Sequence, residues 1–181
     1  MIHNSQIDEI INLLMVPIEN PILTALSKIT SIIFEPIILT IISFAIAIYF
    51  FKKNQKIKAL ILIGAMAFSG AVIKISKEIF QRTRPLNSLI QETNFAFPSG
   101  HATIVVVFLG LITYLFSKKD SKKQMTIVTI FLILFIGFTR IYLRVHWFTD
   151  VIAGFILGSV ILFTSIKLLE HYRKVSKFNE N

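Results

Sequence analysis

The stretch NFAFPSGHATIVVVFLGLITYLF, residues 94–116, begins as a turn and continues as an apolar run. Pro98 and Ser99 are typical of a helix start, because proline fixes the backbone of the first turn and a serine side chain can cap it. Residues 102–116 carry no charge and approach the length of about 20 residues that a helix needs to cross a bilayer. The stretch therefore predicts a membrane helix with a titratable side chain, His101, at its mouth.

Similar apolar windows recur along the chain. They cover residues 59–76, 102–116, 125–143 and 151–169, and a shorter uncharged window covers 36–51. With 54% hydrophobic residues, 16% charged residues and a mean hydropathy of +0.72, the chain lies outside the range of soluble domains. We predict an all-α fold, a polytopic transmembrane helix bundle with five clear spans, in a single integral membrane domain over residues 1–181.

The N-terminal segment, residues 1–35, has two interpretations. Its apolar residues follow helical spacing, but Pro17 and the ENP at 19–21 interrupt the pattern. We favour an interfacial helix followed by a second short helix, and a bent sixth span over about residues 7–33 stays open. Because the segment lacks the basic region of a cleavable signal peptide, we expect it to remain in the mature protein.

The net charge of +9 comes from basic residues in alternate loops. By the positive-inside rule these loops lie in the cytoplasm, so the charge indicates topology and no nucleic-acid partner is expected. A secondary attraction to anionic lipid stays open. The connections at 77–101 and 139–150 then face the extracytoplasmic side of the cell membrane. The three clusters are Lys52, Lys53, Lys56 and Lys58; Lys118, Lys119, Lys122 and Lys123; and Lys167, Arg173, Lys174 and Lys177.

Small residues form two further patterns, GAMAFSG at 64–70 and AGFILGS at 153–159. Such residues let helices approach closely. We interpret both patterns as packing within this bundle in preference to a dimer interface, and the oligomeric state stays open. The chain has no cysteine, which excludes disulfides and thiolate chemistry.

Two charged motifs lie in the first of the extracytoplasmic connections. KEIFQRTRP, residues 77–85, separates Lys77 from Arg84 by six residues. PSGH, residues 98–101, starts a helix at which Gly100 and its neighbours present free amide groups, and such an end binds anions.

A third motif, TRIYLRVHWFTD at 139–150, places Arg140 six positions before His146 and Asp150 four positions after it. If residues 146–150 begin the last helix, His146 and Asp150 share one face. The carboxylate can then accept the imidazole proton and fix its tautomer, which is the geometry of a nucleophile, although such a pair taken alone is more often structural.

Together the motifs bring three cations, a helix start and two histidines to one membrane face. Two-step phosphoryl transfer needs one imidazole that is held by a carboxylate to attack phosphorus and a second, free imidazole to protonate the leaving oxygen. Lys77, Arg84 and Arg140 would neutralise the non-bridging oxygens.

These residues resemble the type 2 phosphatidic acid phosphatase family, whose pattern is Lys-x6-Arg-Pro, then Pro-Ser-Gly-His, then Ser-Arg-x5-His-x3-Asp. The match covers residues 77–150 in order, with every internal spacing kept. Thr139 stands where the family usually has serine. Since a hydroxyl is retained, we expect altered packing of a phosphate contact and no loss of function.

The resemblance implies a role for each matched residue. His146 would be the nucleophile that forms a phosphohistidine, Asp150 its orienting partner, and His101 the general acid and later the base for water. The family uses no metal ion, so we expect neither metal nor cofactor. Family members share a bundle of six helices, which favours residues 7–33 as the sixth helix of this chain. The implied phosphate-binding residues are Lys77, Arg84, Ser99, Gly100 and Arg140.

The expected function is hydrolysis of a lipid phosphate or diphosphate within the bilayer at the extracytoplasmic face. Undecaprenyl diphosphate ranks slightly ahead of phosphatidylglycerophosphate, because the short loops leave no additional headgroup-binding domain. The alternative is a non-enzymatic lipid-phosphate carrier or channel with a bound-anion site.

Other polar and aromatic residues near the motifs receive simpler interpretations. The side chains flanking the third motif are expected to form an aromatic and basic interfacial belt. Arg82 is interpreted as an interfacial anchor. The strongest functional role that we expect for Arg82 or Glu92 is control of substrate entry. Lys74 either lines the pocket or extends outward. The belt residues are Tyr142, Arg144, Trp147 and Phe148, and the expected surface histidines are His3 and His171.

Overall fold

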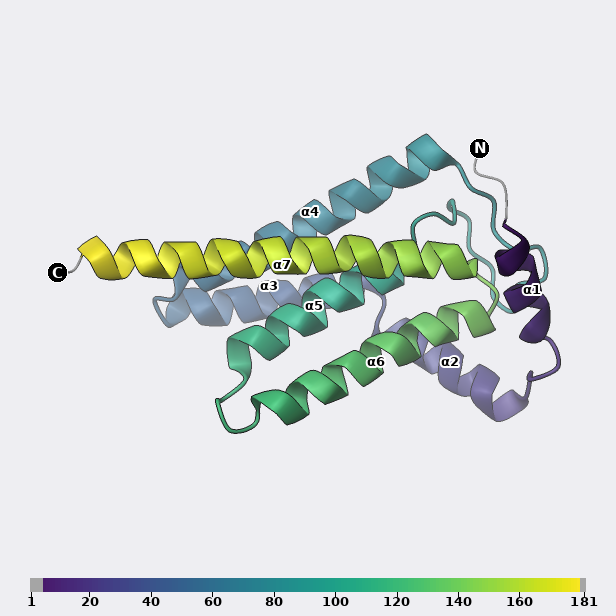
Figure 1. The fold of residues 1–181 in the computed structure, drawn as a ribbon, viewed down its shortest axis with the longest axis horizontal. Coiled ribbons are helices and arrows are strands. Elements are labelled where there is room, and N and C mark those ends of the chain that lie inside the picture. The colour runs from purple at the N-terminus through teal and green to yellow at the C-terminus, as the bar shows by residue number, and fades with distance from the viewer. Residues whose placement is uncertain (1–4, 180–181) are drawn as a thin grey trace.

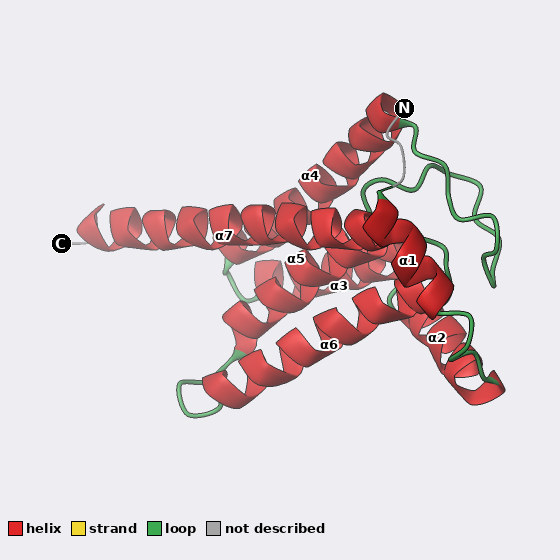
Figure 2. Ribbon diagram, turned by 45° about the vertical axis from the view of Figure 1, so that its right-hand side comes forward, coloured by secondary structure: helices red, strands yellow, loops and turns green. Residues whose placement is uncertain are grey.

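The structure, a computed structural model, describes residues 5–179, with side chains up to Val175. These residues form seven α-helices and no strand (Figures 1 and 2), which confirms the all-α prediction over this range. His3 lies outside the described residues. The helices are α1 (Gln6–Leu14), α2 (Pro21–Ile33), α3 (Pro36–Lys52), α4 (Lys56–Phe80), α5 (Gly100–Phe116), α6 (Lys122–Tyr142) and α7 (Phe148–Asn179).

Several of these helices begin at residues whose chemistry favours a helix start. Proline occupies the first turn of α2 and α3, where its missing N–H would have no partner in the helix. Ser5 and Asp8 form a capping box at α1, and Asn20 caps α2. Ser99 caps α5 by accepting a hydrogen bond from the backbone of Ala102. The helix start predicted at Pro98 and Ser99 is confirmed.

The centre of the bundle is α5, which contacts α3, α4, α6 and α7. Its closest neighbour is α7. At Gly154 and Gly158 of α7 the two helices lie so close together that a side chain would collide with α5. A Cβ at Gly158 would lie 2.7 Å from the carbonyl oxygen of Thr103. The packing predicted for residues 153–159 is confirmed. At residues 64–70 no atom lies within 4 Å of where the glycine Cβ atoms would be, so the glycines make no such approach there.

Three helices, α4, α6 and α7, are long and apolar enough to cross a membrane. α2 and α3 meet the same test only together, as a pair bent by 43°. Both α3 and α5 have 17 residues, which at 1.5 Å per residue fall a few ångströms short of a hydrocarbon core of about 30 Å. Residues 5–179 therefore contain three or four candidate spans, and the predicted count of five is not confirmed.

The N-terminal segment forms two short helices, as the favoured interpretation predicted. α1 contacts α7 and lies at the end of the bundle opposite the C-terminus (Figure 1), and α2 contacts α6. The chain turns between Leu14 and Pro21, so the bent pair combines α2 with α3 and does not consist of residues 7–33.

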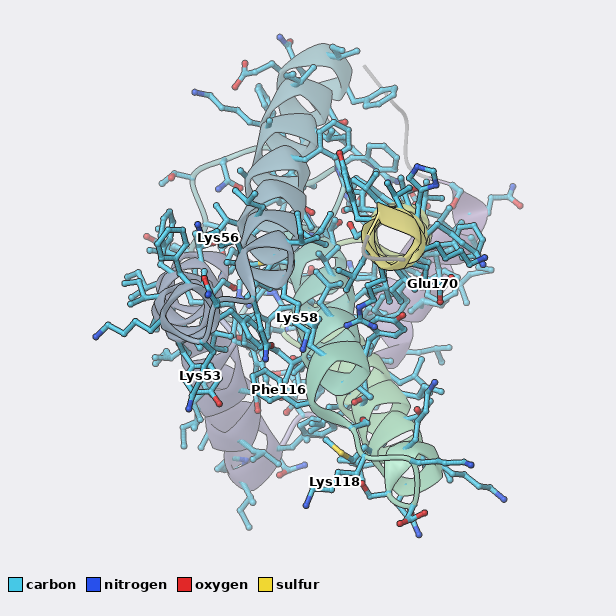
Figure 3. The ribbon with its side chains drawn as sticks, turned by 90° about the vertical axis from the view of Figure 1, so that its left-hand side faces the viewer. Lys53, Lys56, Lys58, Phe116, Lys118 and Glu170 are labelled. Atoms are coloured by element: carbon cyan, nitrogen blue, oxygen red, sulfur yellow. The ribbon has the colours of Figure 1, made fainter. Side chains whose placement is uncertain are left out.

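The bundle has two chemically different ends. The junctions α3–α4 and α5–α6 and the C-terminal part of α7 lie at one end, while the connections α4–α5 and α6–α7 lie at the other (Figure 1). Figure 3 looks onto the first end, where Lys53, Lys56, Lys58 and Lys118 are labelled. The structure thus separates the basic clusters from the three motifs along the length of the helices.

Candidate active site

A pocket of about 800 Å³ lies where α3, α4 and α5 meet the α4–α5 connection. Its lining combines charged and polar side chains with apolar side chains from α3 and α4 that include Ile37, Phe44 and Met66. Lys74, whose direction the sequence left open, lines the pocket. The structure gathers five of the predicted site residues on this surface: Lys77, Arg84, Gly100, His101 and His146.

His146 lies in the short connection between α6 and α7 and is 3% exposed. Arg84 donates a hydrogen bond to its Nε2 over 3.3 Å and another to the carbonyl oxygen of Val145. Because a guanidinium only donates, Nε2 carries the lone pair and the proton resides on Nδ1. Nδ1 faces Asp150 Oδ2 at 3.5 Å and makes no hydrogen bond. The expected pair is present, and its contact is loose.

The surroundings of His146 favour a neutral imidazole. Burial lowers the pKa of His146 well below its usual 6.5, and the cations Arg84, Arg140 and Lys77 lower it further. A neutral ring keeps a lone pair on Nε2, which can form a bond once Arg84 releases it.

Asp150 connects the second and third motifs. Its Oδ1 accepts a hydrogen bond from Arg82 at 2.6 Å, and its Oδ2 accepts the backbone N–H of Trp147 at 2.9 Å. Its carbonyl oxygen accepts the backbone N–H of Ser99 at 3.0 Å. The start of α5 is therefore fixed against the first turn of α7.

His101 lies in the first turn of α5, and its Nε2 has two acceptors. These are the carbonyl oxygen of Ser31 at 3.1 Å and Oε2 of Glu35 at 3.2 Å. Since both partners accept, Nε2 carries a proton. The prediction that this second imidazole is free of a carboxylate partner was wrong. Glu35, at the bend between α2 and α3, was missed, and its only signal was an acid within apolar sequence.

All three of the expected phosphate-binding cations have acidic or amide partners. Arg140 donates to Glu92 Oε1 and to Ser31 Oγ, both at 2.7 Å, and is 1% exposed behind the pocket wall. Glu92 also lies 3.8 Å from Arg84. Lys77 donates to Asn94 Oδ1 at 3.1 Å. Glu92, which was expected at most to gate the substrate, therefore belongs to the pocket lining, next to the cations.

Two hydroxyl-bearing residues of the motifs are turned away from the pocket. Ser99 is fully buried, and its side chain caps α5. Thr139 is also buried and donates its hydroxyl to the carbonyl oxygen of Ile136 within α6. The substitution at Thr139 therefore affects packing in the last turn of α6.

The interpretation of the residues around the third motif as an interfacial belt was wrong for three of the four, and the fourth, Phe148, is half-buried. Tyr142, Arg144 and Trp147 are at most 7% exposed, because each holds another segment in place. The Tyr142 hydroxyl lies 2.8 Å from that of Thr24 in α2. Arg144 pairs with Glu19, and Trp147 Nε1 donates to the carbonyl oxygen of Thr83 at 2.8 Å.

Arg82, interpreted as an interfacial anchor, is 2% exposed and pairs with Asp8 and Asp150. The interpretation was therefore wrong. The sequence did not reveal these partners, because both acids lie far from Arg82 along the chain. Among the histidines outside the motifs, His171 is exposed as expected. Within the part of the chain that the structure describes, no group of three or more His, Asp or Glu side chains is arranged to hold a metal ion.

Residues 58–174 match the model of the PAP2 superfamily. The chain belongs to this superfamily. It is 34% identical over 125 residues to an undecaprenyl-diphosphatase of Sulfolobus acidocaldarius, covering 65% of this chain and 58% of that protein. It is 30% identical over 138 residues to phosphatidylglycerophosphatase B of Bacillus subtilis, covering 73% and 66%. The matched region thus spans less than two thirds of either relative.

The PAP2 fold is also shared with a solved structure. The crystal structure of a transmembrane PAP2-type phosphatidylglycerolphosphate phosphatase from Bacillus subtilis has a TM-score of 0.82 and 28% sequence identity. The superposition covers 91% of this chain and 85% of that one. The resemblance inferred from the motifs is confirmed at the level of the superfamily.

Proposed function

We propose that this PAP2 protein hydrolyses a lipid phosphate or diphosphate, without a metal ion, through a phosphohistidine at His146. The observation that carries the proposal is the convergence of His146 and His101, with Lys77 and Arg84, on one pocket at one end of the bundle. Both curated relatives described above bear the names of lipid phosphatases, which supports the same class of reaction.

In the first step, the Nε2 lone pair of His146 attacks phosphorus. The bond between phosphorus and the leaving oxygen breaks. His101, which begins this step as an imidazolium with a proton on each ring nitrogen, passes its Nε2 proton to that oxygen and becomes neutral. His146 then carries the phosphoryl group on Nε2 and a proton on Nδ1, so its ring is positively charged. The carboxylate of Asp150, 3.5 Å from Nδ1 in the structure, stabilises this charge.

In the second step, His101 accepts a proton from a water molecule whose oxygen attacks phosphorus. The P–Nε2 bond breaks, and its electron pair returns to His146, which again becomes neutral. Inorganic phosphate leaves, and His101 again holds a proton on Nε2. The two imidazoles therefore end the cycle in the states in which they began it.

The charge of the transferring phosphoryl group is neutralised by fixed cations. Lys77 and Arg84 line the pocket, and Arg140 reaches it through Glu92. An incoming phosphate takes the place of the Glu92 carboxylate beside Arg140, so cation and anion remain paired throughout. The backbone amides at Gly100 add donors at the positive end of α5.

The lining of the pocket supports a substrate with a hydrocarbon tail. The same pocket is lined by the cations and by apolar side chains of α3 and α4. A lipid in the bilayer can place its headgroup against the cations while its tail lies along those apolar side chains. Undecaprenyl diphosphate is our first candidate and phosphatidylglycerophosphate the second, since these are the lipids in the relatives' names.

We propose an extracytoplasmic active site in the cell membrane, with α3 to α7 as five crossings. This assignment rests on the basic clusters, which mark the opposite end of the bundle as cytoplasmic. α3 and α5 are each short by a few ångströms, which local thinning of the bilayer accommodates at small cost.

Because the chain has no cysteine, a single introduced thiol reports this topology. Leu86→Cys, at a fully exposed position of the α4–α5 connection, should react with a membrane-impermeant maleimide in intact cells. Asp120→Cys, exposed in the α5–α6 connection, is the matched control and should react only after permeabilisation. The reverse pattern would place the site in the cytoplasm.

A panel of lipid phosphates tests the reaction itself. The purified protein is supplied with undecaprenyl diphosphate, phosphatidylglycerophosphate and phosphatidic acid in detergent with a chelator, and inorganic phosphate is measured. We expect release from at least one lipid and none with His146→Ala. Binding of the lipids without any release would favour the carrier or channel, and activity that needs added magnesium would contradict the mechanism.

A further inference from the structure

Arg82 joins two buried carboxylates that lie far apart in sequence. Its Nη2 donates to Asp8 Oδ2 and its Nη1 to Asp150 Oδ1, each over 2.6 Å. None of the three side chains is more than 2% exposed. One guanidinium between two carboxylates leaves the cluster with one net negative charge. The two-step reaction proposed above uses Asp150 but gives no role to Arg82 or Asp8.

Asp8 is held by more partners than a helix cap requires. The backbone N–H of Ser5 donates to Oδ2 at 3.2 Å, which completes the capping box, and the Ser5 hydroxyl donates to the same oxygen at 2.8 Å. In addition, Thr149 donates its backbone N–H to Oδ1 and its hydroxyl to Oδ2, both at 2.9 Å. Burial raises the pKa of Asp8, but the hydrogen bonds from Thr149, Arg82 and Ser5 outweigh it and hold the pKa below its usual range. The group is therefore a carboxylate tied to the residue that precedes Asp150.

The contact with Arg82 decides which way Asp150 faces. With Oδ1 occupied by Arg82, Oδ2 is directed to the backbone N–H of Trp147 and to Nδ1 of His146. Without Asp8, the charge of Arg82 would act on Asp150 alone. The carboxylate would then be drawn toward the guanidinium and would oppose the positive charge on His146 less strongly.

We propose that Asp8 is a positioning residue, which acts through Arg82 to hold Asp150 against His146, so that α1 completes the active site. The inference rests on the proposed function, because the orientation of His146 matters to turnover only if that ring attacks phosphorus. Asp8 lies outside residues 58–174, the part of the chain that matches the PAP2 model. The three motifs therefore do not contain this element of the site.

The test compares Asp8→Asn with Glu9→Gln in the full-length protein. Both changes remove one negative charge from α1, but Glu9 is exposed and Asp8 is buried. Turnover is measured with the lipid that the wild type hydrolyses best and is divided by the number of sites that bind orthovanadate, a phosphate analogue. We expect Asp8→Asn to lower kcat per site by about 10- to 100-fold, as small displacements of reacting groups do, with KM unchanged. Glu9→Gln should match the wild type.

Two further variants keep the inference testable if Asp8→Asn does not fold. Asp8→Glu keeps the charge and a residue type suited to the capping box, so it should retain more turnover per site than Asp8→Asn. Thr149→Val keeps both charges and removes only the hydroxyl that contacts Arg82 and Asp8. It should lower kcat per site by less than Asp8→Asn does.

Partial unfolding removes vanadate sites and turnover together, so it leaves turnover per site unchanged. An unchanged value in Asp8→Asn would overturn the inference, while an active wild type would uphold the proposed function. An equal loss in Glu9→Gln would do the same. If the wild type released phosphate from no lipid, the proposed function itself would fail, and the inference with it.

Discussion

Gly154→Ala should damage both the stability and the activity of the protein, because Gly154 lies where α7 and the start of α5 touch. An added Cβ would lie 2.8 Å from the carbonyl oxygen of Ser99 and 2.8 Å from Cβ of Ala102. Both distances are shorter than real contacts of this kind, and the first partner is backbone that cannot rotate away. The two helices must therefore separate at the level where His101 and Asp150 are held.

The size of the effect follows from two opposing terms. Overpacking of this kind costs about 1–3 kcal/mol, while replacing glycine by alanine inside a helix returns up to about 1 kcal/mol. Because the displaced segment carries His101, turnover should fall by about 100-fold for a shift near 1 Å. Gly158→Ala meets Thr103 at 2.7 Å, one turn further from the site, and should cost similar stability with a smaller loss of turnover.

Thermal unfolding in detergent and phosphate release, measured on the same preparations, check these values. Gly64→Ala is the matched control, because no atom lies within 4 Å of the added Cβ. It should keep full activity and be slightly more stable. Full activity and unchanged stability in Gly154→Ala would refute the reasoning that this contact sets the spacing of the site.

Two further predictions concern the pocket. The imidazole of His146 should titrate well below pH 6.5, because burial and neighbouring cations lower its pKa. Its NMR signal is identified as the one that is missing in His146→Gln. A pKa at or above 6.5 would contradict the neutral ring. Since the unfolded chain takes up this proton first, the same group should make the protein less stable as pH falls through about 6.5. Glu92→Gln removes the carboxylate that pairs with Arg140 and Arg84, so orthovanadate should bind more tightly, and weaker binding in calorimetry would show that Glu92 supports the pocket.

The features that sequence predicted correctly are local ones. The start of α5 follows from Pro98 and Ser99, and the close approach of α7 follows from the spacing of Gly154 and Gly158. Both depend on residues a few positions apart, whose effect on the backbone does not need the rest of the fold. The motifs likewise contain five residues that meet at the pocket, but the predicted site residues Ser99, Arg140 and Asp150 are buried outside its lining.

The features that sequence did not predict are pairings between distant segments. In the sequence, Arg82 cannot be distinguished from an arginine that anchors a helix at the membrane interface. Only the fold shows that Asp8 of α1 pairs with it. Glu35 likewise reaches His101 because the chain bends between α2 and α3. Sequence indicates that buried charges need partners, but it does not indicate which partner the chain brings near.

The central claim is that His146 carries the phosphoryl group between the two steps, and trapping that intermediate tests it most directly. Protein mixed with lipid substrate bearing a radiolabelled terminal phosphate is denatured within the first turnover, and label bound to the chain is measured. In the wild type we expect bound label that resists alkali and is released by acid, as a phosphohistidine is, and in His146→Ala we expect none. Label that persists in His146→Ala, or an active wild type that never retains label, would contradict it.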